Sequence, residues 1–143
     1  MRMHIYLNLA GNAAEAFGFY RSVFGGEFSS HVRFRDLPME GVEIPEEDQD
    51  KALHIALPIG DNDLLMASDA LESLGQKLEP GNNSYISIHP DSREEADRIF
   101  SALSAGGQVE MPIAEQVWGD YYGAFTDRFG VRWMVNHSPL VGV

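Results

Sequence analysis

A histidine near the start of an apolar strand is the residue best suited to acid–base chemistry in this sequence. His54 lies in segment 53–59, whose alternating apolar residues are typical of a half-buried β-strand. Imidazole titrates near neutral pH, so a strand histidine facing a ligand would act as a general acid or base. A half-exposed histidine bonded to a neighbouring side chain fits the same pattern. We take His54 as the candidate catalytic residue and as a ligand contact, and leave open whether the chain is catalytic.

Two polar residues and a methionine mark the end of another predicted strand. Segment 64–68 contains Met66 and ends at Ser68, and Asp69 follows directly. A hydroxyl and a carboxylate at a strand end could orient a polar ligand, or could form an Asx or ST turn as the chain leaves the sheet. Met66, together with Met134 on a later predicted strand, would give a site a soft apolar lining. All four residues are ligand-binding candidates.

Aromatic residues gather in one stretch of the second half. Trp118 and Tyr122 lie close together in the sequence, with Gln116 just before them. Aromatic side chains that carry a polar group suit a site for flat or amphipathic molecules. They suit a subunit interface equally well. Gln116, Trp118 and Tyr122 therefore complete the candidate ligand-binding set, with the interface as the alternative.

The charge and amino-acid composition limit the kinds of partner that the chain can bind. The chain has 22 acidic and 10 basic residues and a net charge of -12, which repels phosphate backbones and anionic lipids, so we expect neither nucleic acid nor membrane as a partner. It has no cysteine, which excludes disulfides, a thiolate nucleophile and sulfur-ligated zinc. No long apolar segment opens the chain or interrupts it. We expect a cytoplasmic protein.

The elements that would position these residues occur twice. A predicted strand, helix and glycine stop cover 5–9, 12–24 and 25–26, and the same order returns about 80 residues later over 85–88, 92–103 and 106–107. Three further strands follow each helix: 28–34, 53–59 and 64–68, then 109–113, 121–126 and 131–136. The pattern is βαβββ, repeated. It predicts one α+β domain over 1–143, made of modules at about 1–70 and 82–138.

Both helices carry sequence signals for their ends. Asn12 and Ser92 each precede a helix and are followed three residues later by Glu15 and Glu95, which is the pattern of a capping box. Glycine pairs end both helices. The acidic segment 36–50 has no counterpart in the second half and is predicted to be a mobile, solvated loop. It lacks the spacing of a calcium-binding loop.

Several motifs in a fixed order indicate a family. They are Asn12-x-x-Glu15-Ala16 with Phe19-Tyr20, Tyr6 to Asn12, His54 followed by Ile59-Gly60-Asp61, Met66 to Asp69, and Trp118-Gly119 with Tyr122-Gly123 and Thr126 to Met134. On these motifs the chain resembles the vicinal oxygen chelate superfamily, which includes glyoxalase I, extradiol dioxygenases and bleomycin-resistance proteins. The resemblance is strongest to the PhnB-type branch, often labelled demethylubiquinone methyltransferase-like. No Gly-rich loop with an acidic ribose partner is present, so we do not predict a methyltransferase.

The resemblance implies a curved eight-stranded mixed sheet with the helices outside, a ligand cup inside, and a homodimer. In metal-using members, His, Glu or Gln from the first and last strands of each module hold a divalent ion that acts as a Lewis acid. The matching positions here fall on Ile5, Tyr85, Met134 and segment 64–68, which lack imidazole and carboxylate groups. We therefore predict no metal and no other cofactor. A register shift of one residue would bring in His4 or Asn136, which keeps a divalent metal as an alternative.

Three functions remain open at this point. The first is a metal-free dimer that binds a small organic ligand in an apolar, aromatic-rimmed cup. The second is a divalent-metal-dependent lyase, isomerase or dioxygenase that uses unusual ligands such as His4, His54 or Asp69. The third is a non-catalytic assembly module whose cup is filled by its own side chains.

Overall fold

The computed structural model describes residues 1–139, which form two compact units. Unit 1 covers Met1–Glu79 and unit 2 begins at Pro80. Unit 1 contains β1 (Ile5–Leu9), α1 (Ala13–Phe24), β2 (Ser30–Arg33), β3 (Ala52–Ile59) and β4 (Asp63–Asp69), with short 3-10 turns at Phe34–Asp36, Glu46–Asp48 and Glu72–Leu74. Unit 2 contains β5 (Ile86–Ile88), α2 (Arg93–Ser104), β6 (Gln108–Glu115), β7 (Tyr121–Thr126) and β8 (Arg132–His137).

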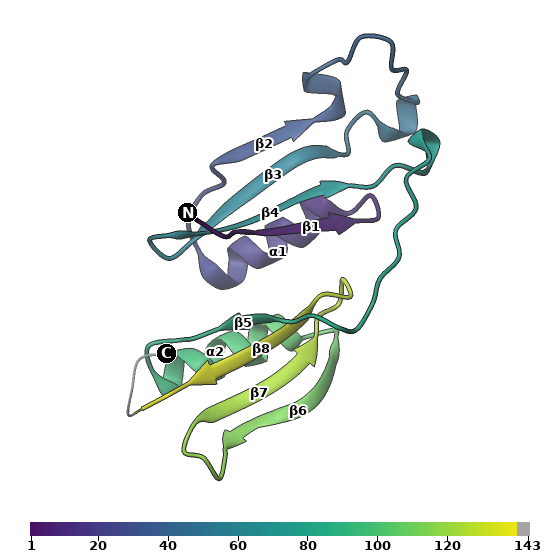
Figure 1. Cartoon of the computed structure of the whole chain (residues 1–143). Coiled ribbons are helices and arrows are strands. Elements are labelled where there is room, and N and C mark those ends of the chain that lie inside the picture. Colours follow the sequence, from purple (N-terminus) through teal and green to yellow (C-terminus); the bar gives the residue numbers. More distant parts are fainter. Residues whose placement is uncertain (140–143) are drawn as a thin grey trace. The chain divides into compact units, whose positions relative to one another are not determined.

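The two units share one topology, as the coloured chain in Figure 1 allows the reader to follow. Each has a four-stranded mixed sheet, ordered β1-β4-β3-β2 in unit 1 and β5-β8-β7-β6 in unit 2. The first strand of each unit pairs in parallel with the last, and the other pairs are antiparallel. The predicted α+β class and the βαβββ repeat are therefore confirmed.

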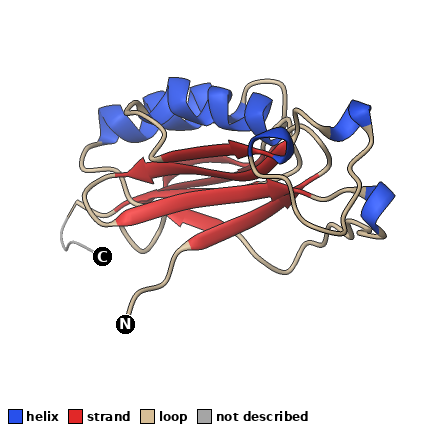
Figure 2. Cartoon of the chain, turned by 90° about the horizontal axis from the view of Figure 1, so that it is seen from above, coloured by secondary structure: helices blue, strands red, loops and turns tan. Residues whose placement is uncertain are grey.

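In unit 1, α1 covers one face of the sheet and packs against β3 and β4. Phe17 and Tyr20 of α1 are buried, and so are the alternate strand residues Ile55, Leu57 and Leu65. In Figure 2 the long helix ribbons lie outside the sheets that the strands form. Since side chains alternate along a strand, the other set of strand residues must lie on the face that α1 leaves uncovered.

In unit 2 the helix-covered face is built around aromatic rings. Phe100 of α2 meets Phe125 of β7 edge-on, with ring centroids 5.1 Å apart, and Trp133 of β8 is fully buried. A Cβ atom added at Gly123 would lie 2.6 Å from the Phe100 ring, so only glycine fits there. The close approach of α2 to β7 depends on that missing side chain.

The start of α1 differs from the prediction. Asn12 makes no capping hydrogen bond through its side chain, and its Oδ1 is buried without a partner among the described residues. Asp69, at the end of β4, accepts hydrogen bonds from the backbone N–H groups of Gly11 and Ala13, both at 3.0 Å. The predicted capping box at Asn12 is wrong because a carboxylate distant in sequence supplies the acceptor. A negative charge also suits the positive end of a helix.

The start of α2 follows the sequence signal closely. Ser92 Oγ accepts a hydrogen bond from the Glu95 backbone N–H at 3.1 Å. The Glu95 carboxylate reaches back to the N–H of Asp91, one residue before the cap. None of the helices in the described part of the chain is long and apolar enough to cross a bilayer.

Candidate functional site

The uncovered face of the unit 1 sheet brings together several of the predicted site residues. Tyr6 of β1 pairs with Met66 of β4, which pairs in turn with Ala56 of β3. One step along, Ser68 pairs with Asn8 and donates a weak hydrogen bond of 3.4 Å to its side chain. Because alternate residues share a face, these side chains lie opposite the face that α1 covers.

His54 is on this face and contacts Tyr6, a residue that the sequence analysis did not select. The Tyr6 hydroxyl is hydrogen-bonded to His54 Nδ1 at 3.2 Å, and the two rings stack with centroids 5.7 Å apart. Tyr6 is 47% exposed. The two rings thus form an aromatic surface, and the hydroxyl of Tyr6 is bonded to the imidazole of His54.

A cavity of about 500 Å³ lies at the end of the unit 1 sheet where β3 begins and β4 ends. Its wall is mainly apolar, with two polar side chains and one carboxylate: Phe34, Met39, Val42, Leu53, Leu74, Ser68, Gln76 and Asp69. Pockets of this size and character commonly hold small organic ligands. Ser68 belongs to both the cavity wall and the uncovered face, so the two features meet at this residue.

Asp69 has a structural role that limits what it can offer a ligand. It is only 3% exposed, and besides the two bonds to the α1 start it accepts a third, at 2.8 Å, from the backbone N–H of Ala52. Both carboxylate oxygens are therefore engaged by the backbone. Ser68 and the amide group of Gln76 are the freer polar groups of the wall, although the Gln76 oxygen already accepts a bond from the Leu71 N–H.

The uncovered face of unit 2 holds a polar cluster that the sequence analysis missed. Tyr85 donates a 2.6 Å hydrogen bond to Glu110, and Arg132 pairs with the same carboxylate at 2.9 Å. Arg132 also donates to the Tyr85 hydroxyl, and its guanidinium lies 4.6 Å from the centre of that ring. The Thr126 hydroxyl donates a further hydrogen bond, 3.1 Å long, to the Glu110 carboxylate. These bonds lower the pKa of Glu110, that from Tyr85 having the largest effect.

The three aromatic-cluster candidates lie around the turn between β6 and β7 of unit 2. Gln116 donates to the backbone carbonyls of Ala114 and Tyr122, which shapes the turn. Trp118 is 61% exposed, and its ring centroid lies 6.3 Å from that of Tyr122. Burial raises the pKa of Tyr122, with smaller contributions from Tyr85 and Glu110. The structure thus groups these three residues with one another, while Met134 pairs with Ala124 and Ser87 on the uncovered face of the sheet, which Tyr122 shares.

Within each unit, the donors present do not form a site for a divalent metal ion. In the described residues no three or more His, Cys, Asp or Glu side chains converge as a metal site would require. On the unit 1 face His54 has a phenol as its polar neighbour, and on the unit 2 face the carboxylate of Glu110 already pairs with an arginine. A divalent ion needs several anionic or imidazole donors to offset the loss of its water.

Comparison with known proteins places the chain in a family. The family model described as Glyoxalase/Bleomycin resistance protein/Dioxygenase superfamily matches residues 3–135. The chain belongs to this superfamily. It is 33% identical to protein YjdN of Escherichia coli, with 95% of each chain covered. Among solved structures, it is similar to protein PA1353 of Pseudomonas aeruginosa, at 38% identity and a TM-score of 0.85, covering 96% of this chain and 98% of that one.

A second structural relative supports the fold at lower identity. It is described as a putative 3-demethylubiquinone-9 3-methyltransferase, PhnB protein, from Bacillus cereus. The identity is 22%, the TM-score is 0.76, and the match covers 96% of this chain and all of that one. The family model confirms the predicted resemblance to the superfamily, and a PhnB-like structure is among the structural neighbours.

Proposed function

We propose that this protein binds a small, mainly apolar organic molecule without a resident metal ion, and that the unit 1 cavity holds the apolar part of that ligand. The cavity is the observation that carries the proposal. Its volume of about 500 Å³ suits a ligand of one or two rings, and its wall combines five apolar side chains with a few polar ones.

The polar residues give the ligand an orientation in this proposal. Ser68 links the cavity to the uncovered face, where His54, Tyr6 and Met66 offer a hydrogen-bonding group beside flat or soft apolar surfaces. A molecule with one apolar end and one hydrogen-bonding end would fill the cavity and contact this face. Asp69 is left out of ligand binding because the backbone uses both of its oxygens.

A fluorescent probe tests the cavity directly. N-phenyl-1-naphthylamine is neutral and apolar, and its emission rises when it leaves water. We expect saturable binding at one site per chain with a Kd in the micromolar range. Replacing Leu53, which lines the cavity, by Gln would bury an amide against the ligand and weaken binding by about tenfold or more.

Leu64→Gln is the matched control for this experiment. Leu64 is also half-buried in the sheet of unit 1 but lies at the other end of β4, outside the cavity wall. Its replacement should leave probe binding unchanged within about twofold. Equal loss in both variants, or no saturable binding to the native chain, would overturn the proposal.

Metal independence has its own test. Protein purified from cells without chelator and analysed for transition metals should hold far less than one ion per chain, and adding nickel, zinc, manganese or iron should leave its thermal unfolding unchanged. A tightly bound ion at one per chain would restore the metal-dependent reading. In that case His54→Ala would show whether the imidazole is a ligand.

Self-association and location complete the proposal. Its support is the superfamily membership, since the resemblance implies a homodimer, together with the cysteine-free sequence, which suits the reducing cytoplasm. Sedimentation at several concentrations should give twice the chain mass of 15.9 kDa. A single species of monomer mass would contradict the homodimer.

A further inference from the structure

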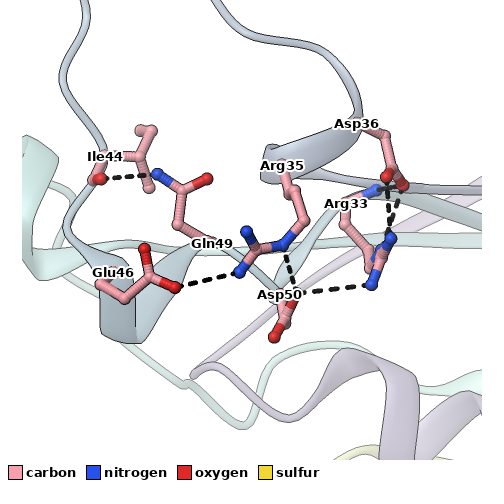
Figure 3. Close-up of polar contacts among 7 residues, drawn as sticks. All are labelled: Arg33, Arg35, Asp36, Ile44, Glu46, Gln49 and Asp50. Carbon is pink, nitrogen blue, oxygen red and sulfur yellow. Dashed lines mark hydrogen bonds and ion pairs between the residues drawn. The ribbon is translucent and has the colours of Figure 1, made fainter.

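Residues 37–44, here called the flap, leave and rejoin unit 1 through a network of ion pairs. Arg33 pairs with Asp36 at 2.9 Å and with Asp50 at 3.4 Å, as Figure 3 shows. Arg35 pairs with the same Asp50 at 2.8 Å and with Glu46 at 3.2 Å. The two arginines precede the flap, and Glu46 and Asp50 follow it. The network therefore joins the two ends of the flap.

Backbone hydrogen bonds also join the two ends of the flap at its base. The Phe34 N–H donates to the Lys51 carbonyl and the Arg35 N–H to the Gln49 carbonyl, at 3.1 and 2.8 Å. The Gln49 side chain donates to the Ile44 carbonyl at 2.8 Å. The sequence predicts segment 36–50 to be a mobile, solvated loop. These bonds order its base, and Asp48 is buried, while most of its other acidic residues are exposed.

Residues 38–43 form the tip of the flap, which has far fewer polar contacts than the base. In the described structure, the backbone hydrogen bond within residues 38–43 runs from the Val42 N–H to the Met39 carbonyl, which closes a turn inside the flap itself. No hydrogen bond or ion pair joins residues 38–43 to the rest of the described chain. The tip nevertheless contributes Met39 and Val42 to the cavity wall, and Val42 remains 40% exposed.

The part of the cavity wall that follows β4 is fixed more firmly. The buried Asp48 accepts hydrogen bonds from Lys51 at 2.5 Å and Ser73 at 2.9 Å, and both lower its pKa, Lys51 more strongly. Ser73 lies between the β4 end and the wall residues Leu74 and Gln76. One side of the cavity is therefore tied to a buried carboxylate, while the other side is carried by a tip without polar anchors.

We propose that the flap is the gate of the cavity: it opens at its ionic base to admit a ligand, and closes Met39 and Val42 over it. This inference rests on the proposed binding function. Segments with few buried contacts and no hydrogen bonds to their surroundings open locally at low cost. The ion pairs at the base are exposed, so each contributes little and is screened by salt, which makes them suited to opening without loss of the fold.

Thiol accessibility tests the gate with little background, since the chain has no cysteine. Leu53→Cys places a thiol on the cavity wall, and its rate of reaction with Ellman's reagent should report opening. Arg35→Gln removes the pairs to both Glu46 and Asp50 and should accelerate that reaction by about threefold to tenfold. Raising the salt from 0.05 to 1 M should accelerate it in the same direction.

Two controls separate local opening from general unfolding. Arg21→Gln removes a comparably exposed ion pair, to Glu27, that lies outside the flap and should leave the rate unchanged. Ile59→Cys places a half-buried thiol at the other end of β3, and its rate should not respond to Arg35→Gln. A Leu53→Cys rate that ignores Arg35→Gln, or an equal acceleration at Ile59→Cys, would overturn the gate.

The gate and the binding function fail in different ways. If N-phenyl-1-naphthylamine binds and Leu53→Gln abolishes binding while the thiol rates ignore Arg35, the cavity is a ligand site without this gate. If the probe does not bind at all, the binding function fails regardless of the thiol rates. If both hold, the probe should also protect Leu53→Cys from the reagent.

Discussion

Two buried carboxylates, those of Asp69 and Asp127, each accept several hydrogen bonds that fix the local backbone. Asp69 receives three backbone N–H groups, and Asp127 receives the N–H groups of Phe129 and Val131 and the Trp133 indole at 2.8 to 3.0 Å. Both residues are 3% exposed. Asp127 thereby closes the turn that precedes β8 and also binds the buried indole of Trp133.

Neutralising Asp69 should therefore be costly. Asp69→Asn replaces one acceptor oxygen by a donor that faces backbone N–H groups, and we expect the free energy of unfolding to fall by about 2–4 kcal/mol. Urea unfolding followed by circular dichroism measures it. Asp63→Asn, at the exposed start of β4, should change it by less than about 0.5 kcal/mol. Similar values for the two variants would show that the carboxylate is not what holds the α1 start.

The lowered pKa of Glu110 predicts how the stability of unit 2 depends on pH. A carboxyl whose pKa is lower in the folded state than in the unfolded state stabilises the fold above its unfolded value of about 4.3, and this stabilisation is lost as the pH falls through the folded value. The Glu110→Gln variant should therefore lose stability relative to the native chain at pH 6, and the difference should shrink below pH 4.

Tryptophan fluorescence is the right signal for this measurement, because Trp118 and Trp133, both in unit 2, are the chain's two tryptophans. Urea unfolding at several pH values would give the difference directly. Glu115→Gln is the control, since its pair with Arg93 is long at 3.5 Å and exposed. A Glu110→Gln difference that stayed constant from pH 6 to pH 3 would contradict the assignment.

At the scale of single elements, some glycines could be replaced by alanine without a clash, whereas others lie too close to neighbouring atoms for any side chain. Gly18 lies inside α1 with nothing within 4 Å of an added Cβ, whereas a Cβ at Gly107 would lie 2.1 Å from the Thr126 carbonyl oxygen. Gly18→Ala should stabilise the protein by about 0.5–1 kcal/mol, because alanine favours helix. Gly107→Ala should destabilise it by more than about 2 kcal/mol.

Thermal unfolding of the two variants compares them directly. The transition should move upward for Gly18→Ala and downward for Gly107→Ala. Shifts in opposite directions would show that the destabilisation of Gly107→Ala comes from its close contact with Thr126 and not from alanine itself. Movement of both transitions in one direction would contradict the packing described for the α2–β6 connection.

The elements themselves were largely predictable from local pattern. Strands 5–9 and 121–126 match β1 and β7 to the residue, and Ser92 caps α2 as its sequence predicts. Predicted strand 28–34 shrinks to Ser30–Arg33 because Phe34 begins a 3-10 turn. The error at Asn12 has a different origin: its replacement acceptor, Asp69, is 56 residues from the Ala13 it binds, and no local pattern encodes such a contact.

The candidate site was only partly predictable for the same reason. His54, Met66 and Ser68 were selected from strand patterns, and the sheet does place Met66 and Ser68 on one face with Tyr6 and Asn8 as neighbours. Tyr6 was missed because the family resemblance pointed to Ile5. The buried Leu9 and Leu65 lie on the opposite face of the strands, so strand alternation could have identified the face of Tyr6. The cavity lining from Met39, Val42 and Gln76 comes from irregular segments, which carry no periodic signal.

At the scale of the whole molecule, the repeat supplies two units with the same framework and different contents. Unit 1 carries a cavity, an acidic flap and a Tyr6–His54 pair on its uncovered face. Unit 2 carries a polar cluster in which Glu110, Arg132 and Tyr85 bond to one another, while the buried Nε of Arg132 has no hydrogen-bond partner among the described residues. Because the cavity in unit 1 has a mainly apolar wall, we assign the proposed ligand binding to unit 1.

The most direct test of that assignment is a titration of ¹⁵N-labelled protein with N-phenyl-1-naphthylamine, followed by amide chemical shifts. We predict the largest shifts at the cavity wall, at the amides of Leu53, Ser68, Leu74 and Gln76, with smaller ones through the flap and little change in β6 and β7. Shifts confined to unit 2, or none at saturating probe, would contradict the account.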